Sequence, residues 1–425
     1  MSYSTLPPSI KAVLSEMLSP LPLKLSIDCW GKDQLAINHT LDDLPQIQLR
    51  IHHPGVIRTL FLSQDPFVLA EAYLQNFLDF TGEIEDVMCL DKLSLSHLKR
   101  SLLVKAWLEA IALPRLPLSL QAQTPWQKLT ARTRDRDLAV IEHHYNIGND
   151  FYRLWLDPNC VYSCAHFEHE KMSLQAAQEA KLDLICQKLQ LKPGDYLLDI
   201  GCGWGGLLCW AATHYGVKAH GITLSKEQLA FNQQLIASKG LEQQLTVQLL
   251  DYRDIPQKPT FDKIVSIGMV EHVGVKNYPI YFQRALSALK PEGLFLNHGI
   301  TASEAWNGST LNERFIQRYI FPDVEASRLF TILQGAEEEG FEIVDVDAWR
   351  VHYGKTLRCW ADNLNENLEQ AIALIGERRV RIWQIYFIGC ALAFEQNQMG
   401  IYQVLHRRRA DRTWNLPLTR KNWVC

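Results

Sequence analysis

The chain has 425 residues, a formal net charge of −4, and 47% hydrophobic against 21% charged residues. This length predicts more than one domain. The near-neutral charge excludes an overall attraction for nucleic acid or an anionic membrane, so any contact with lipid must come from a local patch. The ten cysteines include no C-x-x-C pair, so we expect no metal site and reduced thiols in a cytoplasm. The N-terminus shows no signal-peptide pattern, and the longest uncharged apolar stretch, Ile382–Phe394, is shorter than the ~20 residues that span a bilayer.

Residues 1–112 are predicted to form a smaller α+β domain. Apolar residues alternate with polar ones over Leu23–Ile27 and Ile47–Ile51, a pattern typical of half-buried strands. A helix is predicted over Val68–Phe80, and a short strand from Thr81. Three prolines and a mixed-charge run then predict a linker over residues 113–136.

Residues 137–425 are predicted to form a second, larger domain. Short apolar runs alternate there with helical patterns, which predicts an α/β domain with a mainly parallel, Rossmann-like sheet and helices on both faces. The predicted strands are Tyr196–Ile200, Lys218–Ile222, Leu245–Leu249, Lys263–Ile267, Leu294–His298 and Glu342–Val346. Two late helices are predicted over Leu364–Ile375 and Arg379–Gln396.

A glycine-rich loop follows the first of these strands, over Asp199–Gly206. Glycines let the backbone approach a ligand that lies beyond the carboxyl end of a strand. A dinucleotide fold would carry an acidic residue ~20 positions later to hold the ribose, whereas the second strand here runs into Thr223-Leu224-Ser225. Because Asp199 can hold the cationic end of a methyl donor, the pattern favours S-adenosylmethionine. A tight turn without a ligand is the alternative, and Asp251 and Tyr252 are candidate adenine neighbours or simple turn residues.

From Glu142 to Gln403 the chain resembles the cyclopropane-fatty-acid synthase family, which is related to the mycolic acid cyclopropane synthases. The motifs that carry the resemblance lie at residues 144–150, 162–165, 198–206, 221–228, 251–254, 266–274, 297–300, 318–322 and 353–357. The resemblance implies the class I S-adenosylmethionine-dependent methyltransferase fold. It also implies that the methyl group of S-adenosylmethionine is added to a cis double bond of a phospholipid acyl chain, and that bound bicarbonate serves as the base that closes a cyclopropane ring.

The resemblance also implies a set of site residues. The bicarbonate ligands would be Cys164, Glu271, His298, the backbone of Ile300, and Tyr353. The cofactor residues would be Tyr162, Ser163, Gly201, Gly203, Thr223, Leu224, Gln228 and Gly268. Two departures from the family pattern are Gly299, where members usually carry Thr, and Leu250, where Gln is common. Residues 1–112 resemble only the longer members of the family, and only loosely.

Other interpretations remain open from the residues themselves. Taken singly, Cys164 is typical of a buried thiol, Glu271 of a helix-start carboxylate, His298 of a core histidine and Tyr353 of a core aromatic; together they favour the catalytic interpretation. One rival function is a methyltransferase that leaves a methyl or methylene branch on an acyl chain, or that methylates an amine. Another is a lipid-binding protein without catalysis in which residues 1–112 act.

A basic, tryptophan-containing segment ends the sequence. It comprises His406, Arg407, Arg408, Arg409, Arg412, Trp414, Arg420, Lys421 and Trp423. Such a segment could contact anionic headgroups, and a solvated tail is the alternative. With the resemblance, we expect a cytoplasmic homodimer bound peripherally to the inner face of the membrane, with no nucleic-acid partner. The domain at residues 1–112 would serve lipid binding or dimerisation.

Overall fold

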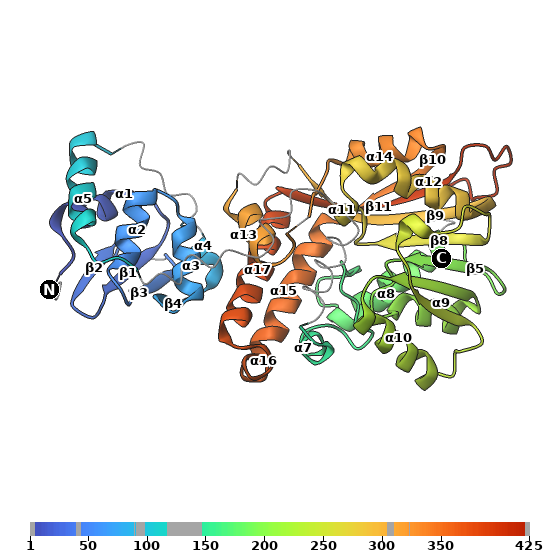
Figure 1. Cartoon of the computed structure of the whole chain (residues 1–425), viewed down its shortest axis with the longest axis horizontal. Helices are drawn as coiled ribbons and strands as arrows, with labels where there is room; N and C mark the ends of the chain where they lie inside the picture. The colour runs from blue at the N-terminus through green and yellow to red at the C-terminus, as the bar shows by residue number, and fades with distance from the viewer. Residues whose placement is uncertain are drawn as a thin grey trace. The chain divides into compact units, whose positions relative to one another are not determined.

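The computed structural model describes residues 5–39, 44–88, 90, 98–116, 147–303, 310–322 and 324–420. The chain forms two compact units (Figure 1). The first comprises residues 1–128 with 310–312 and 377–389, and the second comprises the remaining residues. No helix in the described ranges is long and apolar enough to cross a membrane. The predicted linker lies outside the described residues from position 117 onward.

The first unit is built on a four-stranded sheet in the order β2-β1-β3-β4. Its strands are β1 (Lys24–Cys29), β2 (Asp33–Ile37), β3 (Gln46–Ile51) and β4 (Leu78–Thr81). Its helices are α1 (Pro8–Leu18), α2 (Gly55–Ser63), α3 (Phe67–Leu74), α4 (Ile84–Met88) and α5 (Arg100–Ala112). Both predicted strands are confirmed, because every second residue of β1 and β3 is buried in one apolar core.

The predicted helix over Val68–Phe80 is wrong in its second half. Helix α3 ends at Leu74, and the chain turns at Asn76, whose φ is +59°. Leu78–Thr81 then pairs antiparallel with β3 as β4. Thr81 therefore ends a strand instead of starting one. The backbone hydrogen bonds between this short segment and β3 stabilise the strand more than its local sequence pattern favours a helix.

The second unit contains a seven-stranded sheet in the order β10-β11-β9-β8-β5-β6-β7. Its strands are β5 (Tyr196–Ile200), β6 (Lys218–Thr223), β7 (Leu245–Leu249), β8 (Phe261–Ile267), β9 (Leu289–Ala302), β10 (Phe341–Ala348) and β11 (Met399–Arg408). Strands β5 to β9 pair in parallel, and β11 is antiparallel to both β9 and β10. The predicted Rossmann-like α/β fold is confirmed.

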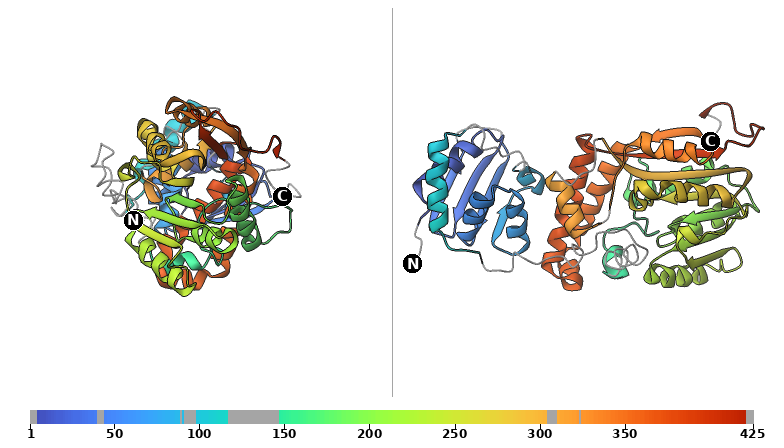
Figure 2. Two further views of the ribbon diagram at one scale, coloured as in Figure 1. Left: turned by 90° about the vertical axis from the view of Figure 1, so that its right-hand side faces the viewer. Right: turned by 45° about the horizontal axis from the view of Figure 1, so that its top comes forward.

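Helices cover both faces of this sheet (Figures 1 and 2). The helices from residue 147 onward are, in chain order, α7 (Asn149–Arg153), α8 (Leu174–Lys188), α9 (Gly206–Tyr215), α10 (Lys226–Ser238), α11 (Val270–Val273), α12 (Tyr278–Ala288), α13 (Leu311–Tyr319), α14 (Leu329–Glu338), α15 (Arg350–Glu366), α16 (Leu368–Ile375) and α17 (Glu377–Glu395). By their contacts, the start of α13 and residues 377–389 of α17 belong to the first unit. Successive side chains of a strand point to opposite faces of the sheet. Leu197 therefore packs with α8 and α9 on one face, and Leu198 packs with α12 and α14 on the other.

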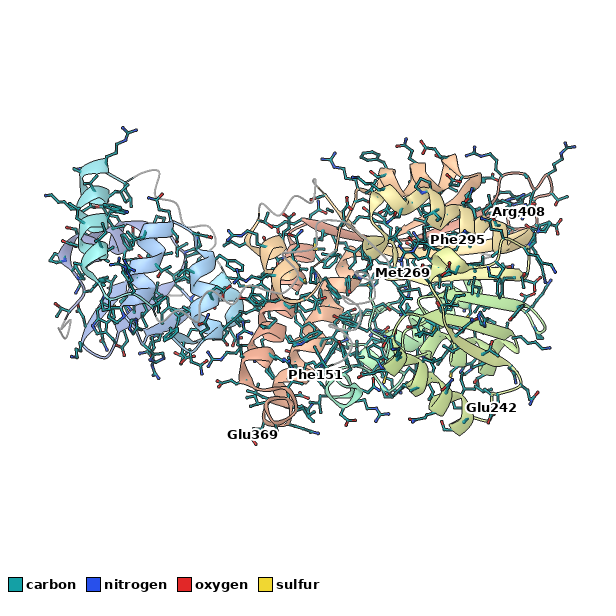
Figure 3. The ribbon with its side chains drawn as sticks, viewed as in Figure 1. Phe151, Glu242, Met269, Phe295, Glu369 and Arg408 are labelled. Carbon is teal, nitrogen blue, oxygen red and sulfur yellow. The ribbon has the colours of Figure 1, made fainter. Side chains whose placement is uncertain are left out.

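The largest correction concerns the predicted basic tail. Residues 406–408 end strand β11, where His406 and Arg407 are buried. His406 stacks on Phe295, which Figure 3 labels on β9. The Arg407 guanidinium donates to the carbonyls of Asp411 and Thr413. A surface tail is therefore wrong for these residues, and Lys421 and Trp423 lie outside the described residues.

Candidate active site

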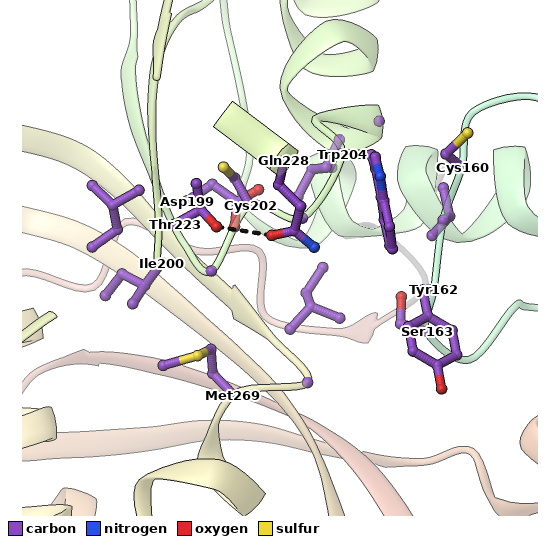
Figure 4. Close-up of a pocket in the computed structure, with 18 of the residues that line it drawn as sticks. Cys160, Tyr162, Ser163, Asp199, Ile200, Cys202, Trp204, Thr223, Gln228 and Met269 are labelled. Carbon is purple, nitrogen blue, oxygen red and sulfur yellow. Dashed lines mark hydrogen bonds between the residues drawn. The ribbon is translucent and has the colours of Figure 1, made fainter. Parts of the chain in front are cut away.

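A pocket opens where the strand order reverses. The chain moves from β5 outward through β6 to β7 and then returns to β8 on the other side of β5, and in doubly wound sheets ligands bind at the carboxyl ends of the strands beside such a switch point. Figure 4 shows this pocket. Its lining includes the predicted residues Tyr162, Ser163, Asp199, Gly201, Gly203, Thr223, Leu224, Gln228, Tyr252 and Gly268.

Asp251 is not among the residues that line the pocket. Its carboxylate accepts from the Arg253 side chain at 2.8 and 2.5 Å and from the Arg253 backbone amide at 2.8 Å. It thereby caps the short turn that presents Tyr252 to the pocket. Leu250, where the family commonly has Gln, does line the pocket, so this departure falls on the pocket wall.

Three of the four glycines in the loop have positive φ, +86° at Gly201, +54° at Gly203 and +83° at Gly205. The structure requires a glycine at these positions for different reasons. A Cβ at Gly205 would lie 2.0 Å from the Asn232 side chain, whereas a Cβ at Gly203 would meet nothing within 4 Å. Gly205 is therefore required for packing, and Gly203 leaves open space beside the pocket.

The end of β6 and the start of α10 form another part of the pocket wall. Ser225 caps α10 by accepting from the Gln228 amide at 3.2 Å. The Thr223 hydroxyl then donates to Gln228 Oε1 at 2.8 Å, the dashed bond in Figure 4. Because that oxygen is occupied, the side-chain NH2 of Gln228 remains for a ligand.

A buried lysine that was not predicted from the sequence interacts with two of the predicted pocket residues, Ser163 and Asp199. Lys181 on α8 is fully buried, and its ammonium donates to the Ser163 hydroxyl at 2.8 Å. Burial lowers its pKa to about 8, against the attraction of Asp157, Cys164 and Asp199. Burial also raises the pKa of Asp199 to about 7, and Lys181 limits that rise. Its place between apolar residues of α8 is the feature of the sequence that could have predicted a buried lysine.

Glu271 lies at the start of α11, next to β9. It is buried, and burial raises the pKa of its carboxyl to about 7, while the backbone amide of Ile300 hydrogen-bonds to it and opposes the rise. The Ile300 amide thus serves Glu271 here, whereas the resemblance assigns it to bicarbonate. Among the described residues nothing hydrogen-bonds to Glu271 Oε2. Gly299 permits this approach, since a Cβ there would lie 2.1 Å from Val270 Cγ1.

Trp349 brings the other three predicted base-site residues together. The Cys164 thiol donates weakly to its carbonyl at 3.9 Å, and the Tyr353 amide donates to the same carbonyl at 3.2 Å. The indole lies edge-on to the His298 ring, with centroids 5.1 Å apart. Burial raises the pKa of the Cys164 thiol, which keeps it protonated.

His298 is held by a chain of side chains that the sequence reasoning did not find. Lys188 donates to Asp347 at 2.6 Å and to Gln403 Oε1 at 2.8 Å. Since an ammonium only donates, the Gln403 amide must present its NH2 to His298 Nδ1, 3.1 Å away. Nδ1 therefore accepts, and the proton of the neutral ring lies on Nε2. Within the described part of the chain Nε2 has no hydrogen-bond partner.

Aromatic rings connect the pocket to the base site. Tyr162, which lines the pocket, lies 5.2 Å from Trp360 between ring centroids, and Tyr353 lies 6.0 Å from the same indole. Gly268 connects the two regions through the backbone, because it lines the pocket and its amide donates to the His298 carbonyl at 2.8 Å. The pocket and the residues predicted to form the base site are therefore neighbours.

Comparisons with known proteins identify the family of this chain. The family model described as mycolic acid cyclopropane synthetase matches residues 132–404. A probable fatty acid methyltransferase of Pseudomonas putida is 38% identical over 97% of this chain and 99% of its own. The cyclopropane-fatty-acyl-phospholipid synthase of Escherichia coli K12 is 39% identical over 66% of this chain and 70% of its own.

Solved structures give the same result. The cyclopropane synthase MmaA2 from Mycobacterium tuberculosis aligns with a TM-score of 0.60 at 35% identity, covering 63% of this chain and 97% of its own. The mycolic acid cyclopropane synthase CmaA1, complexed with SAH and CTAB, also aligns with a TM-score of 0.60 at 35% identity, covering 64% of this chain and 98% of its own. The chain belongs to the mycolic acid cyclopropane synthetase family and is an S-adenosylmethionine-dependent methyltransferase.

Proposed function

We propose that this protein is a cyclopropane-fatty-acyl-phospholipid synthase. It would transfer the methyl group of S-adenosylmethionine to a cis double bond of a phospholipid acyl chain and close a cyclopropane ring. The observation that carries this proposal is one unpartnered buried atom on each of two residues that adjoin Gly268 of the pocket lining: a Cβ at Gly268 would lie 3.9 Å from Glu271 Oε1, and the Gly268 amide donates to the His298 carbonyl at 2.8 Å. Glu271 Oε2 can only accept a hydrogen bond when ionised, His298 Nε2–H can only donate one, and neither has a partner among the described residues.

This pair fits bicarbonate, which has one O–H group to donate and further oxygens to accept. When bound, bicarbonate would supply the base that removes a proton from the transferred methyl group. Glu271 would accept its O–H, and His298 would donate to another oxygen. Without that O–H bond a carboxylate beside an anion would be repelled. Tyr353 is proposed as a second donor, and the Cys164 thiol, protonated in its buried position, as a further contact.

The chain's own residues would also serve the methyl transfer. Asp199 would hold the cationic end of the cofactor, in a pocket whose walls exclude water and fix the direction of attack. Attack by an alkene leaves a carbocation, which aromatic faces stabilise. Tyr162 and Trp360, 5.2 Å apart between ring centroids, are the proposed faces.

A fatty-acyl C-methyltransferase that leaves a methyl or methylene branch is the second candidate. The observation in its favour is the name of the Pseudomonas putida relative, a probable fatty acid methyltransferase that matches over 97% of this chain. Both candidates use the same methyl transfer, and they differ in the fate of the carbocation. Only analysis of the product separates them, since a ring and a methylene branch have the same mass.

The test of the base site is the substitution Glu271→Gln. The amide keeps the shape of the side chain but removes the strong acceptor, so turnover should fall by ~10²–10⁴-fold, the usual contribution of a positioned base. Affinity for S-adenosylmethionine, measured by calorimetry, should stay nearly unchanged. Tyr353→Phe removes a single donor and should cost less. Products are resolved by NMR.

Bicarbonate is tested directly. The wild-type rate should fall in buffer stripped of carbon dioxide and recover when bicarbonate is added, while Glu271→Gln recovers poorly. Bound ion must be assayed in the stripped protein, because tight retention would hide the effect. Full-rate ring formation by protein that lacks the ion would refute bicarbonate as the base. A branched product from the wild-type protein would support the second candidate.

A substrate within a bilayer implies work at a membrane surface. We therefore propose peripheral association with the inner face of the cytoplasmic membrane. Homodimerisation stays a prediction, which light scattering of the purified protein would test.

A further inference from the structure

Helix α5 of the first unit carries an outward-facing apolar stripe. Val104, Trp107, Leu108 and Ile111 are 58%, 43%, 57% and 40% exposed. Their spacing of three and four residues places them on one face of the helix. Side chains of this size are usually covered, and a contiguous apolar patch on a surface indicates an interaction site.

The opposite face of α5 is already used. Ala106 and Ala110 are fully buried in the core of the first unit, where α5 packs against α1 and α2. Arg58 of α2 donates to the Ala110, Ile111 and Leu113 carbonyls at the end of the helix. The stripe therefore lies on a helix whose opposite face is packed in the core of the first unit, and the stripe itself is not part of that core.

Cations surround the stripe. Lys99, Arg100, Lys105 and Arg115 are exposed along α5 and at its ends. Glu109 is the single carboxylate of the helix, and it faces inward, where it accepts from the Ser9 and Ile10 amides of α1 at 2.9 and 3.1 Å. The outward face of α5 therefore offers apolar groups and positive charge without a negative group of its own.

We propose that this outward face of α5 docks on the surface of an anionic lipid bilayer. The inference rests on the proposed function, which requires a membrane substrate, and it names the surface that meets the membrane. Tryptophan prefers the interface between water and hydrocarbon. Helices with apolar residues on one side and cations beside them lie in that plane, and cations near an anionic surface strengthen the attraction.

A second copy of the chain fits this face less well. In a two-fold contact the same patch meets itself. The cations of one α5 would then face those of the other, and no carboxylate of that face could pair with them.

The C-terminal segment is a weaker candidate for membrane contact than its composition predicts. His406 and Arg407 are buried, and Arg420 pairs with Asp345.

The test uses the full chain with Val104→Gln and Leu108→Gln together. Glutamine keeps the helix propensity and changes no charge, so the fold should survive, as circular dichroism would verify. The matched control is Phe330→Gln with Leu374→Gln, which removes two side chains that are 60% and 46% exposed on α14 and α16. Flotation measures binding to vesicles of phosphatidylglycerol, with phosphatidylcholine vesicles as the neutral comparison.

We expect the α5 variant to bind phosphatidylglycerol vesicles at least ~10-fold more weakly than wild type and the control variant to bind as wild type does. Arg100→Gln with Lys105→Gln should weaken binding mainly at low salt. Equal binding by wild type and the α5 variant would overturn the proposal. Loss of a dimer, seen by light scattering, with vesicle binding unchanged would assign the face to a second copy instead.

Turnover on detergent-dispersed phospholipid separates this inference from the proposed function. The α5 variant should keep the wild-type rate there, because the pocket is untouched. If the wild-type protein forms no ring on any lipid, the proposed function fails, while the vesicle measurement still decides whether α5 binds a membrane.

Discussion

Asp199 and Glu271 are two buried carboxyls whose pKa values are both raised to about 7, and the proposed function gives them different tasks. A cationic cofactor favours the ionised form of Asp199. Below a pH of about 7 that carboxyl is protonated, so affinity for S-adenosylmethionine should fall as the pH falls, approaching ~10-fold per pH unit. Calorimetry across neutral pH measures this slope.

The slope should disappear in Asp199→Asn and persist in Glu271→Gln. The second variant is a matched control, because it removes a carboxyl whose pKa is raised to a similar value and which is proposed to act on bicarbonate and not on the cofactor. A slope that survives in Asp199→Asn would show that another group, such as Lys181, controls the pH dependence.

Gly203 gives a second residue-scale prediction. Its φ is +54°, and a Cβ there meets no protein atom within 4 Å, so Gly203→Val should place a side chain where the cofactor lies and abolish binding. Gly240 has a φ of +65° and equally open surroundings but lies outside the pocket. Gly240→Val should suffer the same backbone strain and still bind S-adenosylmethionine by calorimetry. Normal binding by a folded Gly203→Val protein would move the cofactor elsewhere.

The proton position on His298 can be tested by replacing Gln403. In Gln403→Glu both carboxylate oxygens accept, so the His298 proton should move to Nδ1 and leave Nε2 as an acceptor. The ¹⁵N chemical shifts of the ring report the tautomer, and turnover should fall by roughly 10-fold or more, as expected when a site histidine loses its donor role. Gln398→Glu, at an exposed position, is the control. An unchanged tautomer in Gln403→Glu would refute the role given to Gln403.

At the scale of elements, strand β11 replaces the predicted basic tail. Arg407 is buried, pairs with Glu342 at 3.3 Å and lies against Trp414, 5.2 Å from the ring centroid. Arg407→Gln leaves the two carbonyls and this carboxylate without their donor, so the free energy of unfolding should fall by ~1–3 kcal/mol. Arg409→Gln, whose side chain is 57% exposed, should change it by less than ~0.5 kcal/mol. Urea denaturation measures both, and equal values would place residue 407 at the surface after all.

Elements with a clear period or a special residue were predictable from the sequence. The alternation of β1 and β3, the apolar runs of β5 to β8 and the glycines after β5 all reflect local physical requirements. Strand β11 was missed because it is buried on both faces. Its sequence therefore does not alternate between apolar and polar residues, and its arginines and histidine resemble a solvent-exposed segment. Strand β4 was missed because its four residues follow a helix after a short turn at Asn76, and only pairing with β3 distinguishes them.

The motifs predicted most of the candidate site, but not the groups that hold it. All of the predicted pocket residues except Asp251 line the pocket. Lys181 and Gln403 carry no motif, and their roles depend on contacts with residues far along the chain. His298 and Gln403 are 105 positions apart, and no local pattern connects them. The role of the Ile300 amide was also not predictable from the sequence, since it depends on where α11 packs against β9.

At the scale of the whole molecule, alternating strands and helices were enough to predict the Rossmann-like sheet. The near-neutral net charge directs attention to local patches. Composition could not say which patch, because the most basic segment of the sequence is partly buried and α5 is exposed. Sequence alone records which residues are charged or apolar, and only the packing decides which of them reach the solvent.

The position of β11 has a consequence for how the protein is made. Since β11 lies between β9 and β10, neither neighbour has its full set of partners until Met399–Arg408 has been synthesised. At the usual rate of about 5–20 residues per second, the 105 residues from His298 to Gln403 take roughly 5 to 20 s to translate. During that interval β9 presents an unpaired edge, the kind of surface on which nascent chains pair wrongly. His298 acquires its Gln403 contact only after this interval, so the active site is completed among the last events of synthesis.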